Sequence, residues 1–166
     1  MSRRLIRLAS ALVGWITGGL THVMILASAF FAALSGSAPA TCAAIGGMMI
    51  PEMKKKGFPA EFSAAVQCVA GTIGPIIPPS IPMVVYAICA GESVGALFAG
   101  GIIPGLIYAA CLMVVSGLIC KKKGFGAESK TKYDGHETWE AFKDAIWALL
   151  VPVIVLGGIY SGVFTP

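Results

Sequence analysis

Long apolar stretches alternate with short polar ones along the whole chain. No Asp, Glu, Lys or Arg occurs within residues 8–51, 62–91, 93–120 or 145–166. A helix needs about 20 apolar residues to cross the hydrocarbon core of a bilayer, so each stretch is long enough to cross it or to enter and return. The pattern therefore predicts a set of membrane helices.

The first apolar stretch is interrupted by the small polar sequence SGS at 35–37. The helical legs predicted on either side are 21–34 and 38–50, the second ended by Pro51. Each leg would be about 20 Å long, too short for a core about 30 Å thick. Basic residues, which mark the cytoplasmic side, flank both outer ends. We therefore predict that residues 20–51 form a re-entrant hairpin, with its tip inside the membrane and surrounded by protein or a water-filled cavity.

The second apolar stretch contains four prolines within GTIGPIIPPSIP, residues 71–82. Each proline removes a backbone donor and clashes with the preceding turn, so no continuous helix can pass through this motif. The flanking residues 62–70 and 83–90 are nevertheless typical of membrane helices. The pattern predicts one transmembrane helix that is broken near its middle.

The remaining segments complete a layout in which every basic cluster lies on one side. Residues 1–19 are predicted to form a basic amphipathic cytoplasmic helix, and 52–120 the broken helix with its return helix. Residues 121–144 form a polar amphipathic cytoplasmic segment, and 145–166 a further crossing. The expected fold class is an all-α integral membrane protein.

Composition supports the membrane class and narrows the possible functions. Of the 166 residues, 57% are hydrophobic and 12% charged, whereas a soluble domain carries about 25% charged residues. The net charge of +4 does not indicate nucleic-acid binding, because the basic residues flank apolar stretches and form no stripe with aromatic side chains. The five cysteines form no CxxC pair, and we expect no disulfide, no transition-metal centre and no organic cofactor.

The two breaks are the places where this chain can hold an ion. A broken helix leaves free amides at one end and free carbonyls at the other, and paired discontinuous helices near mid-membrane indicate the binding site of a secondary transporter. Ser35, Ser37 and Thr41 offer oxygen atoms at the tip, and Thr72 and Ser80 flank the prolines. The apolar stretches hold no carboxylate for a proton relay, which favours sodium held by neutral oxygens.

His22 is the one histidine within the apolar stretches, and it raises two alternatives. It could relay protons, or it could serve as the general base of an intramembrane serine hydrolase. It lies 13 and 15 residues before Ser35 and Ser37, so a contact would depend on how the chain folds. A lone histidine near a membrane edge more commonly packs or caps a helix, and we expect no enzyme activity.

Four motifs occur in a fixed order: SGS at 35–37, IPEMKKKG at 50–57, GPIIPPSIPMVVY at 74–86 and LFAGGIIPGL at 97–106. In this order and spacing they resemble the large membrane subunit of tripartite ATP-independent periplasmic (TRAP) transporters, the DctM-like family, over nearly the whole chain. Family members are much longer and contain two inverted repeats. The resemblance therefore implies the first half of an elevator-type inverted-repeat transporter, a multi-pass protein of the bacterial inner membrane.

The resemblance also implies a function: sodium-coupled, binding-protein-dependent import of an organic acid such as a C4-dicarboxylate or a sialic acid. The implied partners are a small four-helix membrane subunit, a periplasmic solute-binding protein and the lipid bilayer. Ion and substrate residues of the family correspond here to Ser35, Gly36, Ser37, Thr72, Gly74, Pro75, Pro78, Pro79 and Ser80. The expected sodium ligands among them are Ser35, Ser37, Thr72 and Ser80.

A second interpretation is a truncated membrane scaffold without transport activity of its own. Inverted-repeat transporters form their site between repeats, and this chain resembles one repeat. Flanking genomic sequence distinguishes the two interpretations. A continuation into a second repeat, beside genes for a small subunit and a binding protein, favours the transporter.

Overall fold

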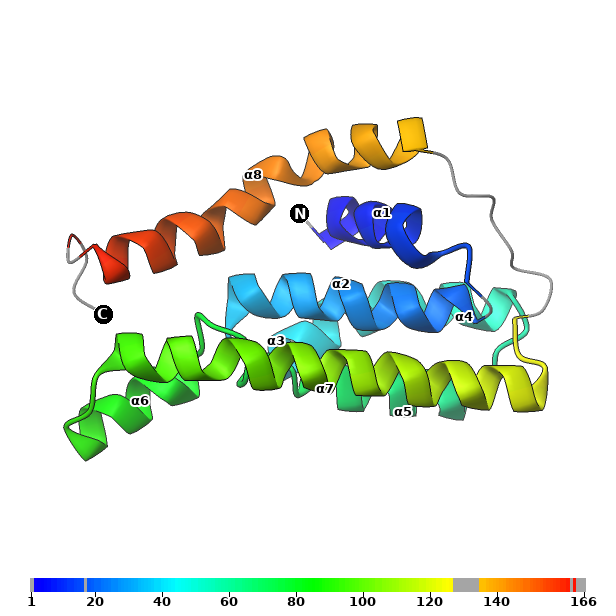
Figure 1. Ribbon diagram of the computed structural model, residues 1–166. Helices are drawn as coiled ribbons and strands as arrows, with labels where there is room; N and C mark the ends of the chain where they lie inside the picture. The colour runs from blue at the N-terminus through cyan, green and yellow to red at the C-terminus, as the bar shows by residue number, and fades with distance from the viewer. Residues whose placement is uncertain (1, 17, 127–134, 162, 164–166) are drawn as a thin grey trace.

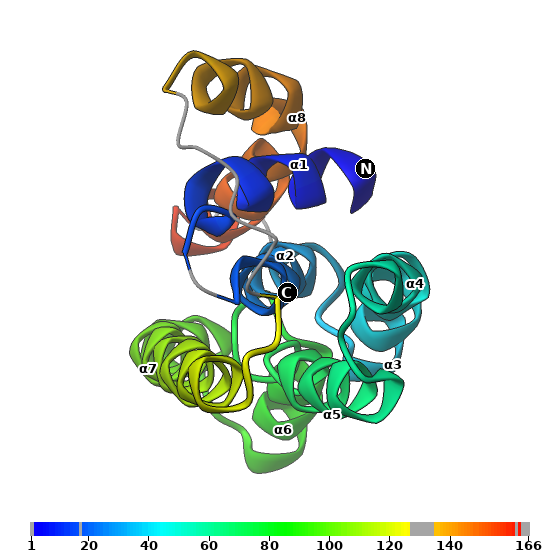
Figure 2. The same ribbon diagram turned by 90° about the vertical axis from the view of Figure 1, so that its right-hand side faces the viewer.

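The computed structural model describes residues 2–16, 18–126, 135–161 and 163, and every regular element in these ranges is helical (Figure 1). The elements are α1 Ser2–Val13, α2 Gly19–Ser35, α3 Ala38–Thr41, the π-helix η1 Cys42–Gly46, α4 Gly47–Lys55, α5 Ala60–Gly71, α6 Ile81–Ala90, α7 Val94–Lys123 and α8 Gly135–Tyr160. Helix α2 is central, because it contacts α1, α3, η1, α5, α7 and α8 (Figure 2).

Two helices in the described ranges are long and apolar enough to cross a membrane, Val94–Lys123 and Thr138–Tyr160. Many of their apolar side chains face outward. Ile103 in α7 is 67% exposed and Trp147 in α8 is 72% exposed. Apolar surface of this kind indicates contact with lipid or with another protein, as the pattern of the sequence predicts.

The predicted break at 35–37 is confirmed, because α2 ends there and a second helical leg, 38–55, begins directly after it. Gly36 has a φ of 60°, a left-handed conformation that glycine adopts without steric penalty. Pro39 lies in the first turn of α3, where a helix has no use for the missing amide hydrogen. Gly36 and Ser37 thus form the tip of a helical hairpin.

Both legs of the hairpin are longer than the sequence indicated. Helix α2 has 17 residues, about 26 Å, and the second leg runs through Pro51 to Lys55 instead of ending before the proline. Proline at position 51 deprives the Gly47 carbonyl of its helical partner. Both residues lie on an exposed part of α4, so the distorted turn disturbs no packed side chain and the helix continues.

The predicted break in the second apolar stretch is also confirmed, since α5 ends at Gly71 and α6 begins only at Ile81. Ser80 starts α6, because its hydroxyl accepts a hydrogen bond from the Met83 amide at 3.4 Å. Pro82 lies in the first turn of α6, where its missing donor is tolerated. The segment 72–80 is called the proline loop below.

Helix α8 joins two segments that the sequence divided at residue 144. No glycine or proline occurs between Lys143 and Val151 to end a helix at that point. The polar first part of α8 packs on α1, where the Arg7 guanidinium lies 2.8 Å from Oδ2 of Asp144 and 3.8 Å from a Glu140 carboxylate oxygen. The apolar second part provides the candidate crossing.

Replacing Arg7 with alanine is expected to loosen the contact between α1 and α8 only slightly. The side chains of both carboxylates and of Arg7 are about half exposed, and such pairs contribute at most about 1 kcal/mol. Salt screens them, so the difference in thermal unfolding between the Arg7→Ala chain and the unchanged chain should vanish at about 1 M salt. A difference that persisted would show that the Arg7 stem acts through packing.

The lysine clusters at the ends of α4 and α7 lie at the same end of the helices (Figure 1). The rings of Phe62 and Phe125, 5.4 Å apart at their centroids, join the segments that follow the two clusters. Arg3 lines a cavity of about 430 Å³ together with Lys55. The lysine clusters of α4 and α7 thus lie at one end of the molecule, and the membrane side that the basic clusters face stays a prediction.

Candidate functional site

The two breaks, far apart in the sequence, pack directly against each other. A methyl group on Gly36 would lie 2.6 Å from the Pro79 carbonyl oxygen, and one on Gly74 would lie 3.0 Å from the Ser37 carbonyl carbon. No side chain larger than hydrogen fits at either position without a shift of backbone. The hairpin tip and the proline loop therefore meet backbone to backbone, through glycines.

Three oxygen atoms cluster at the hairpin tip. The Thr41 hydroxyl donates to the Ser37 carbonyl oxygen at 2.8 Å and lies 3.2 Å from the Ser35 hydroxyl. The Ser35 hydroxyl is in turn 3.5 Å from the same carbonyl. These three neutral oxygens, Ser35 Oγ, Ser37 O and Thr41 Oγ1, are called the tip triangle below. Oxygen atoms of this type are the ligands that hard cations take in proteins.

Thr72 and Ser80 were also expected as sodium ligands, and the structure gives their hydroxyls partners outside the tip triangle. The Thr72 hydroxyl donates to the Val69 carbonyl at 2.7 Å and lies 2.9 Å from the Tyr108 hydroxyl, so it faces α7. The Ser80 hydroxyl donates to the Pro75 carbonyl at 2.7 Å within the proline loop. Ser80 therefore shapes the loop and begins α6.

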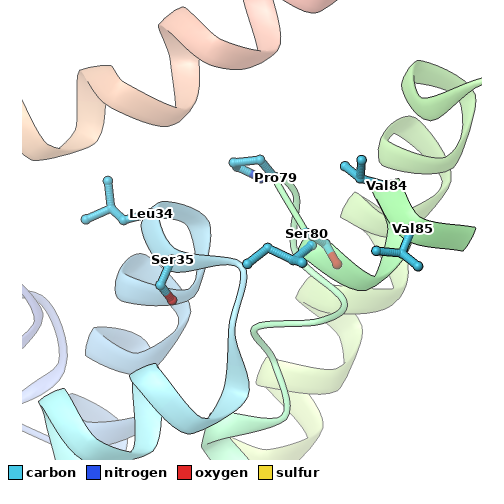
Figure 3. Close-up of a pocket in the computed structure, with 7 residues that line it drawn as sticks. Leu34, Ser35, Pro79, Ser80, Val84 and Val85 are labelled. Carbon is cyan, nitrogen blue, oxygen red and sulfur yellow. The ribbon is translucent and has the colours of Figure 1, made fainter. Parts of the chain in front are cut away.

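A cavity of about 330 Å³ opens beside the two breaks (Figure 3). Its wall consists of Leu34, Ser35, Pro79, Ser80, Ile81, Val84 and Val85. The end of α2 forms one side, and the proline loop with α6 forms the other (Figure 3). Ser35 and Ser80 are the polar residues of an otherwise apolar wall, a composition typical of small-molecule sites. Pro78 is buried and does not belong to this wall.

Helix α7 supports the proline loop from the opposite side. A methyl group on Gly101 would lie 2.6 Å from the Ile76 carbonyl oxygen, and one on Gly105 would lie 2.6 Å from the Ile77 side chain. Both glycines are buried and stand one helical turn apart. The loop therefore rests in a shallow depression on α7 that these two residues create.

His22 lies away from the hairpin tip. Its Nδ1 is 3.2 Å from the Gly18 carbonyl oxygen, and a methyl group on Gly117 would lie 3.2 Å from its ring, so the imidazole packs between α2 and α7. His22 and Ser35 stand on one helix, 13 positions and thus about 20 Å apart. The Ser–His pair of a hydrolase does not form here.

Thr41 was expected to offer an oxygen at the tip but was not among the expected sodium ligands, and Gln67 was not expected at the site at all. Gln67 is the only carboxamide side chain in the sequence, and it is 2% exposed. Its Nε2 donates to the Ser28 hydroxyl at 3.3 Å and to the Thr41 carbonyl at 3.4 Å. Burying an amide without hydrogen-bond partners costs about 2–7 kcal/mol. A lone glutamine in an uncharged apolar stretch therefore indicates that polar partners lie around it in the fold, and this signal could have pointed to Gln67.

Comparison with known proteins extends the resemblance of the motifs to the whole chain. Residues 1–166 match the family described as "Tripartite ATP-independent periplasmic transporter, DctM component". The chain is 49% identical to the isethionate TRAP transporter permease protein DctMQ of Oleidesulfovibrio alaskensis. It is 48% identical to the C4-dicarboxylate TRAP transporter large permease protein DctM of Pseudomonas aeruginosa and 42% to the sialic acid TRAP transporter large permease protein SiaM of Vibrio cholerae.

Each of these alignments covers 100% of this chain, but only 26%, 38% and 38% of the respective relatives. The chain thus spans between a quarter and two fifths of their length. The relatives are permeases, which are membrane proteins, in agreement with the two candidate spans of the structure. Because the family match extends over every residue, the chain belongs to the DctM family of tripartite ATP-independent periplasmic transporters.

Proposed function

We propose that this chain supplies one half of the binding site of a sodium-coupled secondary transporter that imports an organic acid. The relatives' names give isethionate, C4-dicarboxylates and sialic acid as substrates, all of which are organic acids. In this proposal the chain works in the bacterial inner membrane with a small membrane subunit and a periplasmic binding protein. The hairpin is re-entrant, and together with the broken helix it belongs to the moving part of an elevator.

The observation that carries this proposal is the meeting of two helix breaks partway along α7. The proline loop contacts Gly101, seven residues or about 10 Å from the start of α7 at Val94, and Lys121 lies a further 20 residues or about 30 Å along the helix. For a hydrocarbon core about 30 Å thick, an α7 that spans the membrane with Lys121 at one interface brings Gly101 close to the other, and in this proposal both breaks lie in that part of the membrane. Paired helix breaks within a membrane are typical of secondary transporters.

The chemistry of the tip favours sodium as the coupling ion. The tip triangle consists of neutral oxygens, and no charged side chain of the described residues lines the adjacent cavity. A proton-coupled site needs a carboxylate or histidine at this place, whereas a hard cation can replace the hydrogen bonds of the triangle by coordination.

Sodium-driven uptake into proteoliposomes tests the proposal. The assay uses the permease expressed from its complete gene, with its small subunit and binding protein, because the relatives are longer than this chain. Ser35→Ala removes one oxygen of the tip triangle and is expected to raise the sodium concentration for half-maximal uptake about tenfold, since a lost polar ligand is worth about 1–2 kcal/mol. Ser37→Ala keeps the carbonyl that belongs to the triangle and should change this concentration less than about twofold.

Equal effects of the two serine variants would contradict the assignment of the ion to the tip triangle. Uptake that ignores a sodium gradient would contradict sodium coupling. Absence of any uptake by the complete assembly would favour the alternative function, a membrane scaffold without transport activity of its own.

A further inference from the structure

Gln67 connects three parts of the chain through one buried side chain. It projects from α5, and its side-chain amide both accepts a hydrogen bond from the Ser28 hydroxyl on α2 and donates one to it. The same amide donates to the backbone carbonyl of Thr41 on the second leg. All three residues are at most 2% exposed. Polar groups buried this deeply hold fixed partners, because no water is at hand to replace a partner that is lost.

The second leg of the hairpin is shaped around Gln67. A methyl group on Gly46 would lie 2.9 Å from the Gln67 Cγ, and the Cys42 thiol donates to the backbone carbonyl oxygen of Gln67 at 3.6 Å. These contacts fall at the two ends of η1, Cys42–Gly46, the wide turn of the leg. Turns of the π type occur frequently at functional sites, and this one lets the leg pass close beside the glutamine.

We propose that Gln67 is a positioning residue for the tip triangle. Its amide holds the Thr41 carbonyl at 3.4 Å, and the hydroxyl of the same Thr41 is one corner of the triangle, 2.8 Å from the Ser37 carbonyl. Gln67 therefore sets the direction in which Thr41 presents its hydroxyl to Ser35 and Ser37, without contacting the ion. This inference rests on the proposed function, because it treats the triangle as the sodium site.

A Gln67→Met variant tests the role, because methionine keeps the length of the side chain and lacks the amide donor. In the complete transporter, the sodium concentration for half-maximal uptake should rise about fivefold, within the range expected for one lost hydrogen bond. The maximal rate at saturating sodium should stay within about twofold of the unchanged protein. A residue that only stabilised the fold would lower the amount of active protein and leave the sodium dependence alone.

Ser28→Ala is the matched control, because it removes the other partner of the same amide and leaves the bond to Thr41. Its sodium dependence should stay within about twofold of the unchanged protein, although its thermal stability falls. An equal rise in the two variants would reduce Gln67 to a structural role and overturn the inference. An unchanged sodium dependence in Gln67→Met would overturn it as well.

Hydrogen exchange separates a failure of this inference from a failure of the proposed function. The amides of Thr41 and Cys42 bond to carbonyls in the first turn of the second leg, so their exchange reports how firmly that turn is held. Exchange should be at least about fivefold faster in Gln67→Met than in Ser28→Ala. This difference would support the positioning role even if the unchanged transporter showed no sodium dependence, and equal rates would overturn it.

Discussion

Uptake by a Gly36→Ala variant is expected to fall by roughly a hundredfold or to be lost. Alanine at this position must adopt a φ of 60°, which costs about 1–2 kcal/mol. Its methyl group would also lie 2.6 Å from the Pro79 carbonyl oxygen and 3.1 Å from the Ile81 nitrogen. Both are backbone atoms that cannot rotate aside, and overpacking of this kind costs about 1–3 kcal/mol more.

Two other glycines separate these contributions. Gly57 also has a positive φ of 79°, yet a methyl group there would meet nothing within 4 Å. Gly57→Ala should therefore lose only the backbone contribution, about 1–2 kcal/mol of stability, and keep its uptake. Gly47→Ala meets neither constraint and should be neutral or stabilising by up to about 1 kcal/mol, because alanine favours a helix.

Two measurements are needed: uptake per folded transporter in proteoliposomes, and the free energy of unfolding in detergent. If Gly36→Ala behaved like Gly57→Ala, the contact between the hairpin tip and the proline loop would have no part in transport. A loss confined to Gly36→Ala would show that the backbone contact itself is required.

The second large effect is expected for Gly71→Ala, and it should be reversible by a second substitution. A methyl group on Gly71, at the end of α5, would collide with the Cys42 Sγ on the second leg of the hairpin. Once that sulfur is removed, the nearest atoms are the Ala38 carbonyl oxygen at 3.4 Å and the Cys42 Cβ at 3.6 Å, which are ordinary contacts. The Gly71→Ala/Cys42→Ala double variant should therefore regain most of the stability that the single variant loses.

Unfolding in detergent provides the measurement for this cycle. Gly71→Ala should lose about 2–3 kcal/mol, Cys42→Ala at most about 1 kcal/mol because the side chain is half-buried, and the pair should show a favourable coupling of about 2 kcal/mol. Simple additivity of the two single effects would show that α5 and the hairpin do not pack as closely as described.

Both breaks could be predicted from the sequence because glycine and proline act on the backbone locally. The four prolines of residues 71–82 forbid a continuous helix, the glycine of SGS weakens one, and the helices end and begin at these places. Helix ends without such residues were less predictable. Even a single proline is not decisive, since Pro51 lies within α4; no residue near 144 divides α8, and in both cases the outcome depends on packing and exposure in the finished fold.

The composition of the site was predictable only in part. The positions of serine and threonine in the sequence indicated that oxygen atoms gather at both breaks. The direction of each hydroxyl could not be predicted, because it depends on the side of the helix that the residue occupies and on the groups packed against it. Thr72 turns toward Tyr108 on α7, whereas Thr41 returns to Ser35 six residues earlier because the hairpin reverses the chain. The burial of Gln67 beside Thr41 depends on a contact across 26 residues, which no local pattern contains.

The prolines of the proline loop make its interruption permanent. A break built from glycine or serine can rewind into helix when its surroundings change, but Pro75, Pro78 and Pro79 supply no amide hydrogen with which a helix could close. The segment therefore cannot act as a spring that winds and unwinds between states. Any displacement must move the loop as a preformed unit. Motion then changes the surfaces along which the loop packs and leaves its secondary structure unchanged.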